Sequence, residues 1–439
     1  MVWYTIHNWY ALIIAKTTYF YNKLYLLTKK KSYHLSIITV IFSALLLANC
    51  SSAKKVAFES PVDTTAKKIT TQLKKTYSIN ELGVYASNEF DGARLNGFKK
   101  LNDSTALVII NPENTPINNS PYFAFKTWSS SPKDFYFTFQ YPKGFKHRYA
   151  PKLMVDNHWD SIDSTLVSKN DSIVTIKLSL TSSPTIVSGQ EIQSSLDVKN
   201  WYTHLISGKE SFIHIKSAGK STLGRDLPVL DIYKGATKGK PIIVLLTRQH
   251  PPEVTGFYAF QEFLKTIIDS TDLSQNFLNK YRVLAFPILN PDGVDLGHWR
   301  HNAGGVDTNR DWSKYNQPEI KQVVKFITKT SKKNKSQIVL GLDFHSTWND
   351  VFYTNKLREG TTLPNFIENW FASLERNIPN YKVNEVASNS TRPVSKGWFL
   401  YGHNAVGITY EIGDATPKED IIQIGKVSAE QMMKILSNN

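Results

Sequence analysis

The chain divides into two regions that differ in how apolar and polar positions alternate. From about residue 76 to 200, short runs such as 135–141 (FYFTFQY) and 172–180 (SIVTIKLSL) alternate apolar with polar or aromatic residues, and Asn, Asp, Pro, Ser and Gly separate them. A period of two between turn residues is typical of antiparallel strands that bury one face. We therefore predict an all-β sandwich domain over residues 76–200, with a structural or substrate-presenting role.

After residue 201, unbroken apolar runs alternate with longer amphipathic segments. Four runs have the length and composition of buried strands: 228–233, 241–246, 282–289 and 337–344. Three segments have the pattern of helices: 257–268, 318–329 and 363–378. Strands that helices cover on both faces read as continuous apolar runs. We therefore predict an α/β domain over residues 201–439, built on a mixed, mostly parallel sheet covered by helices.

The first 50 residues hold five lysines, no acidic residue and the single cysteine of the chain, Cys50. A basic cluster at 29–31 precedes an apolar run at 35–48, which is shorter than the roughly 20 residues of a membrane-spanning helix. This arrangement is typical of an export signal and resembles a bacterial lipoprotein signal. We expect residues 1–50 to direct export, Cys50 to carry a lipid anchor and the bulk of the chain to be extracytoplasmic. The alternative is an ordinary signal peptide or an uncleaved anchor with a chance cysteine.

Residues 51–75 are rich in Ser, Thr and Lys and are predicted to be a linker. Of the 52 lysines and arginines, 47 lie after residue 50 and face 37 acidic residues, a net charge of +10. Such a surplus suits anionic partners, but we identify no Lys/Arg-dense helix and no repeated aromatic–basic pattern. A solvated basic surface is favoured over nucleic-acid binding, and we expect a monomer.

Residues that can bind a metal follow two of the predicted strands. One strand is followed by the segment QHPPEV, which places His250 and Glu253 three residues apart, and His345 directly follows another strand. Zinc sites of hydrolases commonly keep three His or carboxylate ligands and leave one position for water. A His-x-x-Glu pair alone is more simply a polar turn. With His345 as a third candidate ligand, the residues alone allow both interpretations, a metal site and a polar turn.

A long loop rich in glycine and charge, residues 290–312, lies between these candidates. Loops of this length are uncommon in compact domains unless they are functional. Arg300 and Arg310 offer planar groups suited to a carboxylate or a developing oxyanion, and Asn309 adds a neutral donor. Each arginine taken alone is more simply a solvated surface side chain.

Five separated motifs occur in the order found in zinc carboxypeptidases of the carboxypeptidase A type. They are His-x-x-Glu, the Arg300 loop, Asn309-Arg310, the later strand-end histidine and the segment ITYEIG at 408–413. The resemblance covers roughly residues 201–439. The sequences RQHPPE and NPDG are similar to those of the bacterial and cytosolic-type branch, whose members place a β-sandwich ahead of the catalytic domain.

This resemblance implies a metal centre and a general base. It implies one Zn²⁺ per chain, held by His250, Glu253 and His345. It implies that Glu411 is the general base and that Asp307 orients the imidazole of His250. Without its motif, Glu411 would be read as an ordinary charged strand residue.

The resemblance also assigns residues that bind the substrate. It implies that Arg300 polarises the scissile carbonyl, while Asn309 and Arg310 bind the C-terminal carboxylate of a peptide. The specificity position, 15 residues before the general base, is Lys396, with Arg392 nearby. A basic group there would favour an acidic terminal side chain. Alternatively, the loop is shifted and both basic groups face solvent.

One family feature is missing from its usual position. Members often carry a tyrosine 22 residues before the base, on a loop that closes over the substrate, and here that position is Asn389. Tyr381 and Tyr401 are the alternatives if loop lengths differ. The favoured function is a metallocarboxypeptidase that acts on peptides; a muropeptide hydrolase of the same catalytic type and a non-catalytic peptide-binding lipoprotein remain open.

Overall fold

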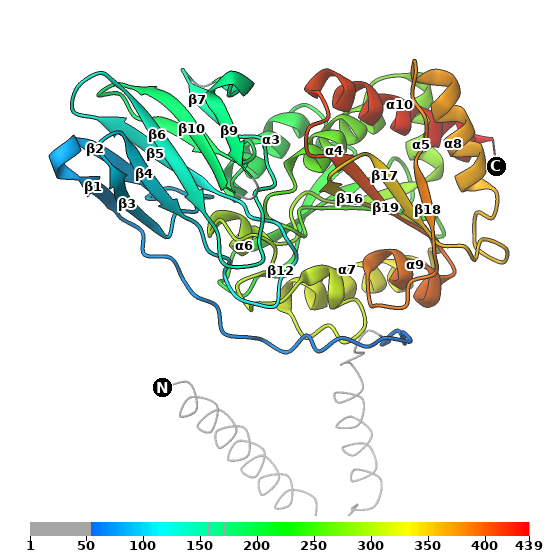
Figure 1. Ribbon diagram of the computed structural model, residues 1–439. Coiled ribbons are helices and arrows are strands. Elements are labelled where there is room, and N and C mark those ends of the chain that lie inside the picture. The colour runs from blue at the N-terminus through cyan, green and yellow to red at the C-terminus, as the bar shows by residue number, and fades with distance from the viewer. Residues whose placement is uncertain (1–53, 157, 171–172, 439) are drawn as a thin grey trace, which may run out of the picture. The chain divides into compact units, whose positions relative to one another are not determined.

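A computed structural model describes residues 54–156, 158–170 and 173–438 of the chain. The predicted export segment 1–50, with Cys50, lies outside these residues. Residues 54–439 form one compact unit, in which two β-sheets are followed by a third, larger sheet and its helices (Figure 1). None of the described helices has both the length and the apolar character needed to cross a membrane.

The first two sheets form a β-sandwich around one apolar core. Their strands are β1 (Thr76–Ile79), β2 (Val84–Ser87), β3 (Gly97–Asn102), β4 (Thr105–Ile109), β5 (Ala124–Ser129), β6 (Lys133–Gln140), β7 (Lys152–Val155), β8 (His158–Ser161), β9 (Val167–Asn170), β10 (Ile173–Leu180) and β11 (Thr185–Ser188). The sheet orders are β1-β2-β5-β11-β7-β8 and β3-β4-β6-β10-β9. In β6, alternate side chains Phe135, Phe137 and Phe139 are buried, as its pattern predicts. The described pairs are antiparallel as expected, except that β4 and β6 run parallel.

The third sheet has eight strands in the order β12-β13-β15-β14-β16-β19-β17-β18. They are β12 (Ile213–Lys220), β13 (Asp226–Ile232), β14 (Ile242–Thr247), β15 (Arg282–Phe286), β16 (Ile338–Thr347), β17 (Val351–Thr354), β18 (Glu385–Ala387) and β19 (Val406–Gly413). The four central strands, β15-β14-β16-β19, are parallel to one another. The four predicted strands correspond to β13, β14, β15 and β16. The expected mixed, mostly parallel sheet is confirmed.

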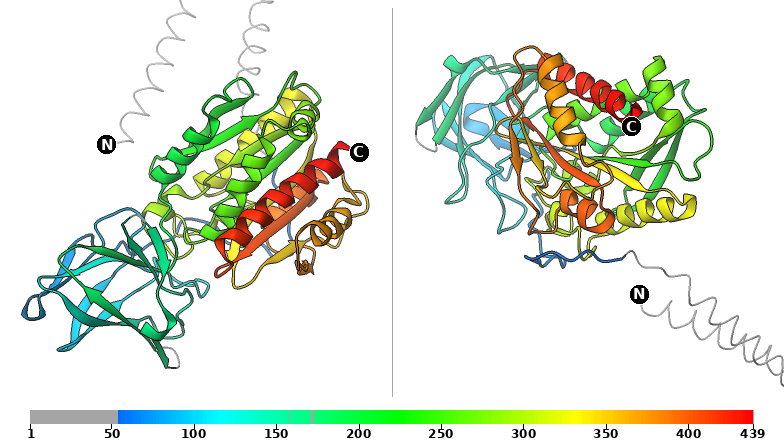
Figure 2. Two further views of the ribbon diagram at one scale, coloured as in Figure 1. Left: turned by 90° about the horizontal axis from the view of Figure 1, so that it is seen from above. Right: turned by 90° about the vertical axis from the view of Figure 1, so that its right-hand side faces the viewer.

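Helices cover both faces of this sheet. They are α3 (Ser195–Ile206), α4 (Val254–Ile267), α5 (Asp272–Lys280), α6 (Pro291–Asp295), α7 (Pro318–Asn334), α8 (Phe366–Asn377), α9 (Ser395–His403) and α10 (Lys418–Ser437). Figures 1 and 2 show α4, α5, α8 and α10 on one face and α7 and α9 on the other. Gly341 of β16 lets α9 rest on the sheet, because a Cβ atom there would lie 2.2 Å from the ring of Phe399. The predicted helices correspond to α4, α7 and α8.

The boundary between the sandwich and the third sheet differs from the predicted one, and one side chain crosses it. The boundary expected at residue 200 falls inside α3, whose buried side chains belong to the core around the third sheet. Trp299, from the loop after α6, is fully buried in the sandwich core. Its indole lies edge-to-face with Phe145, with ring centroids 5.2 Å apart. The division into two separate domains stays a prediction.

Residues 54–75, predicted to be part of a linker, pack as an extended strap on loops around the third sheet. The backbone N–H of Ser60 donates to the carbonyl oxygen of Thr391 at 2.8 Å, and the Thr64 hydroxyl donates to Asp311 at 2.5 Å. Figure 1 shows this segment in blue, passing α7 and α9. The strap therefore differs from a free tether, because its polar side chains and backbone have partners far along the chain.

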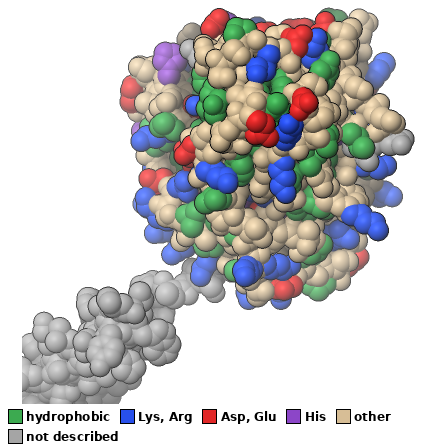
Figure 3. Space-filling view, turned by 60° about the vertical axis from the view of Figure 1, so that its left-hand side comes forward, with side chains coloured by type: hydrophobic (Ala, Val, Ile, Leu, Met, Phe, Trp, Pro, Cys, Tyr) green, Lys and Arg blue, Asp and Glu red, His purple; other side chains and the backbone are tan. Residues whose placement is uncertain are grey.

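The positive charge of the described residues is scattered on one face of the molecule and concentrated on one helix. On the face shown in Figure 3, Lys and Arg side chains are scattered among acidic and apolar ones. Helix α7 is rich in lysine, contrary to the prediction that the chain has no Lys/Arg-dense helix. It exposes Lys321, Lys325, Lys329, Lys332 and Lys333, whereas its acidic residue, Glu319, is buried. The absence of nucleic-acid binding stays a prediction.

Candidate functional site

Three metal-binding side chains meet at the carboxyl ends of neighbouring strands. His250 lies in the turn after β14, Glu253 directly precedes α4, and His345 lies in β16, which pairs with β14. Their ligand atoms all lie within 4.8 Å of one another. Gly256, in the first turn of α4, permits this approach, because a Cβ atom there would lie 2.1 Å from the carbonyl oxygen of His345.

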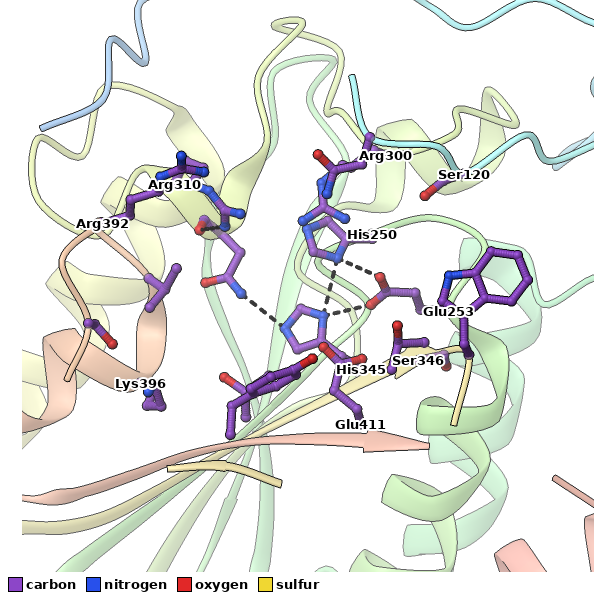
Figure 4. A pocket seen from close by; sticks show the side chains of 18 of the residues that line it. Ser120, His250, Glu253, Arg300, Arg310, His345, Ser346, Arg392, Lys396 and Glu411 are labelled. Carbon is purple, nitrogen blue, oxygen red and sulfur yellow. Dashed lines mark hydrogen bonds and ion pairs between the residues drawn. The ribbon is translucent and has the colours of Figure 1, made fainter. Parts of the chain in front are cut away.

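Each histidine directs its Nδ1 to this point, where Figure 4 shows both rings beside Glu253, and has its Nε2 beside a second carboxylate. Nδ1 of His250 lies 2.8 Å from one oxygen of Glu253, and Nδ1 of His345 lies 2.6 Å from the other. Nε2 of His250 lies 2.9 Å from Oδ1 of Asp307. Nε2 of His345 lies 3.0 Å from Oδ2 of Asp343. Carboxylates in these positions fix the tautomer and the orientation of a metal-binding imidazole.

Asp307 thus lies where the resemblance placed it, whereas sequence reasoning missed Asp343. A signal was present, since Asp343 lies two residues before His345 in β16 and side chains two apart share a face of a strand. Its Oδ2 also accepts a hydrogen bond of 2.6 Å from Nε2 of Gln249. Gln249 and His345 therefore both hold the carboxylate of Asp343 in place.

The donor set fits zinc. Nδ1 of His250 and Nδ1 of His345 lie only 3.2 Å apart, beside both oxygens of Glu253. Although burial opposes it, the two histidines hold the pKa of Glu253 well below its ordinary value, so the carboxylate stays ionised. Two imidazole nitrogens and an ionised carboxylate at one point are a common ligand set of zinc in hydrolases.

Glu411 lies beside this centre. Strands β16 and β19 are parallel and in register, so that Glu411 is the direct neighbour of His345. Burial raises the pKa of Glu411 to about 8, and the charge of Glu253 acts in the same direction. Its Oε2 has no hydrogen-bond partner among the described residues, and the side chain lines a cleft. A desolvated carboxyl with one free oxygen suits a group that takes up and returns a proton.

The loop that follows α6 brings its arginines to the same cleft. Nε of Arg300 donates to Asp307 at 2.7 Å, and Nη1 of Arg310 donates to the carbonyl oxygen of Asn309 at 2.7 Å. Arg300, Asn309 and Arg310 all line the cleft. The side chain of Asn309 also accepts a 2.9 Å hydrogen bond from the backbone N–H of Ser395, which ties this loop to α9.

Lys396 lies within the cleft wall. It is 5% exposed, and its Nζ donates to the carbonyl oxygens of Thr354 and Ser388 at 2.8 and 2.6 Å. Burial lowers the pKa of its amine to about 8. Lys396 and Arg392 both line the cleft. The alternative in which both basic groups face solvent is therefore wrong for Lys396, whose side chain α9 turns toward the sheet, whereas Arg392 is exposed.

Neither tyrosine considered as a replacement for the missing one lines the cleft. Asn389, at the usual tyrosine position, does line it. Tyr401 instead donates to the carbonyl oxygen of Ser390, and Tyr381 packs against the core of the third sheet. The cleft is instead lined by Tyr353, from β17. This tyrosine was missed in the sequence because β17 is short.

The cleft has a volume of about 690 Å³, and the sandwich supplies part of its wall. Asn118, Asn119, Ser120 and Arg148 line it from the sandwich side. Nε of Arg148 donates at 2.7 Å to Asp414, which is the first residue after β19. This wall could not be predicted, because nothing local in the sequence links residues 118–148 to the catalytic motifs.

A family model described as zinc carboxypeptidase matches residues 198–430, which is more than half of the chain. The chain belongs to the zinc carboxypeptidase family. Membership confirms the predicted family, fold class, enzyme class and cofactor, zinc. Cytosolic carboxypeptidase 6 of Caenorhabditis elegans is 30% identical over 152 residues, which cover 33% of each chain. Cytosolic carboxypeptidase 2 of Xenopus tropicalis is 27% identical over 182 residues, 38% of this chain and 18% of that one.

This zinc carboxypeptidase therefore spans about a third or less of these curated relatives. Solved structures are similar over a larger share. A metallo-carboxypeptidase of Burkholderia cenocepacia has a TM-score of 0.67 at 14% identity, over 81% of this chain and 98% of that one. One from Pseudomonas aeruginosa, in complex with (2-guanidinoethylmercapto)succinic acid, has a TM-score of 0.63 at 17% identity, over 80% and 98%. The shared fold therefore extends beyond residues 198–430.

Proposed function

We propose that this chain is an extracytoplasmic zinc metallocarboxypeptidase that removes C-terminal residues from peptides. The observation that carries the proposal is the convergence of Nδ1 of His250, Nδ1 of His345 and the Glu253 carboxylate beside Glu411, in a cleft lined by arginines. Zinc bound there would lower the pKa of a water towards about 7 and polarise a carbonyl group.

The side chains around the metal centre supply the proton transfers and the charge stabilisation. Glu411 takes a proton from the attacking water and later returns it to the leaving amine. Arg300, held at its Nε by Asp307, directs its terminal N–H groups to the carbonyl oxygen of the scissile bond. Such a donor acts mainly in the transition state, because the oxygen carries its full charge only there.

The preference for a chain end follows from the other arginine. Arg310 lines the cleft next to Asn309, and a guanidinium can bind a carboxylate through two parallel hydrogen bonds. The C-terminal carboxylate is the group that distinguishes the last residue of a peptide from the internal ones. Arg310 and Asn309 therefore select the terminal residue for removal.

Lys396 favours an acidic side chain on that terminal residue. Its amine is almost fully buried in the cleft wall and has two backbone carbonyl partners, which leaves one N–H to donate. A carboxylate in the cleft would pair with this charge in a partly dry site. Arg392, which lines the same cleft, adds to the positive potential.

We also propose that the protein is a monomeric lipoprotein anchored through Cys50. The support is the basic cluster, the apolar run and the single cysteine in the first 50 residues. Radiolabelled palmitate should be incorporated into the wild type and not into Cys50→Ala. Equal labelling of both would contradict the anchor without affecting the catalytic proposal.

The decisive experiment measures bound metal together with the masses of products from a mixed peptide library. One zinc per chain and the stepwise loss of C-terminal residues would support the proposal. Purified muropeptides are digested in parallel, and cleavage of these alone would favour a cell-wall hydrolase. Zinc binding without any product would favour a peptide-binding protein, and the absence of zinc would contradict the proposed chemistry.

A further inference from the structure

The sandwich holds the backbone on both sides of Arg300. Glu113, in the loop between β4 and β5, accepts hydrogen bonds from three consecutive backbone N–H groups. The N–H of Trp299 donates at 2.8 Å to Oε2, and those of Arg300 and His301 donate to Oε1 at 3.0 and 2.7 Å. The Glu113 side chain is fully buried. A single carboxylate from the sandwich therefore fixes the main chain that carries Arg300.

Neighbouring contacts hold the same segment by its side chains. The Trp299 indole is enclosed in the sandwich core. Nδ1 of His301 lies 2.5 Å from Oδ1 of Asn114, whose Nδ2 donates to the carbonyl oxygen of Gly305 at 2.9 Å. The residues before and after Arg300 are thus both attached to the sandwich, and the Arg300 side chain is left to reach into the cleft.

The Arg300 side chain then links the Glu113 contacts, which we call the clamp, to the metal centre. Its Nε donates to Asp307 Oδ2 at 2.7 Å, and Asp307 Oδ1 lies 2.9 Å from Nε2 of His250. We propose that Glu113 is a positioning residue for Arg300, so that the sandwich completes the catalytic centre. The inference rests on the proposed function, in which Arg300 donates to the scissile carbonyl.

A carboxylate is well suited to this task. Hydrogen bonds from N–H groups to an ionised acceptor are shorter and about twice as strong as those between neutral groups. Arg94, also buried, balances the charge from the sandwich side, and its guanidinium is fixed by two hydrogen bonds to the carbonyl oxygen of Asn111 at 2.8 and 2.6 Å. Loss of the carboxylate would free three N–H groups at once and release the main chain of Arg300.

The test compares Glu113→Gln with the wild type by steady-state kinetics. The amide keeps one oxygen acceptor but turns an N–H group toward a backbone N–H. Misplacing a transition-state donor by about 1 Å costs on the order of 100-fold. We expect kcat to fall about 10–100-fold with KM changed less than threefold and one zinc still bound. An unchanged kcat/KM would overturn the proposal.

Two comparisons separate positioning from a loss of stability. Glu89→Gln makes the same chemical change at an exposed carboxylate of the sandwich, and Phe137→Leu loosens the sandwich core at a ring that packs on Phe98, Phe125 and Phe135. Both should keep the wild-type kcat per folded molecule. The double variant with Glu113→Gln and Arg300→Gln should have a kcat/KM less than threefold below that of Arg300→Gln alone. If the two losses instead multiply in full, Glu113 and Arg300 do not share a role.

A readout independent of catalysis is amide hydrogen exchange at residues 299–301 in metal-free protein. These N–H groups should exchange at least tenfold faster in Glu113→Gln than in the wild type, while those of β6 keep their rates. If the wild type hydrolyses no peptide, the proposed function fails, and unchanged exchange at these three amides would separately overturn the clamp.

Discussion

Replacing Lys396 with methionine removes the charge from the cleft wall and keeps a side chain of similar length. Opposite charges about 4 Å apart interact by about 4 kcal/mol at the effective dielectric constant of about 20 that suits a partly dry site. The amine already donates to two backbone carbonyls at 2.8 and 2.6 Å, and both charges lose water when they pair. We therefore expect about half of this energy, roughly 2 kcal/mol, to reach the transition state, which corresponds to about 30-fold in kcat/KM.

The assay measures kcat/KM for three peptides that differ only in the last residue, Glu, Gln or Leu. In the wild type, Glu should be preferred over Gln by about 30-fold, and in Lys396→Met the ratio should approach one. Lys356→Met, at an exposed lysine outside the cleft lining, is the matched control and should keep the preference. Wild-type cleavage of the Leu peptide at a rate equal to that of the Glu peptide, or an unchanged ratio in Lys396→Met, would contradict a role for Lys396 in specificity.

The same preference should depend on pH in a defined direction. Burial lowers the pKa of Lys396 to about 8, and a lysine carries its charge below its pKa. The Glu-to-Gln ratio should therefore be largest below pH 7 and fall as the pH rises through 8. In Lys396→Met the ratio should not change with pH over this range, which separates the lysine from other titrating groups.

Other variants test the remaining parts of the site. Glu411→Gln should keep zinc and lose hydrolysis by about 10³-fold, since the proton acceptor is gone; metal content and product masses check both, and unchanged hydrolysis would contradict the assignment. Asp343→Ala should weaken zinc binding about 10–100-fold, because Nε2 of His345 loses its partner, as a competing chelator would measure. Arg148→Met leaves Asp414, whose side chain is 10% exposed, without its ion-pair partner and should lower the free energy of unfolding in urea by about 1–3 kcal/mol. Chelation of zinc should lower Tm, since a metal that binds the folded state stabilises it.

Much of the fold around the third sheet is predictable because its central strands are buried on both faces. The run 241–246 is entirely apolar, and the structure places it as β14 between two other strands. The short strands β17 and β18, at one side of the sheet, lack such a signal, since three or four residues show no clear period. The composition of residues 51–75 predicts a linker, and it could not reveal the strap at 54–75, because the hydrogen bonds to Thr391 and Asp311 join residues far apart in the chain.

The candidate site was predictable where each residue follows a strand or belongs to a motif. His250, Glu253 and His345 were found in this way, and the structure brings them together. Glu113 could not be found, because it contacts a loop 186 to 188 residues further along the chain. Its segment, NPENTPIN, reads as an ordinary turn-rich loop.

The burial of Trp299 in the sandwich has a consequence for how the protein unfolds. A fragment that begins near residue 198, where the family match starts, would expose this indole, and a separate sandwich would contain a hole of its size. Loss of a buried tryptophan costs about 3–5 kcal/mol in typical cores, a large fraction of the stability of a single domain. The two parts should consequently melt as one cooperative unit, with a single calorimetric transition for residues 54–439.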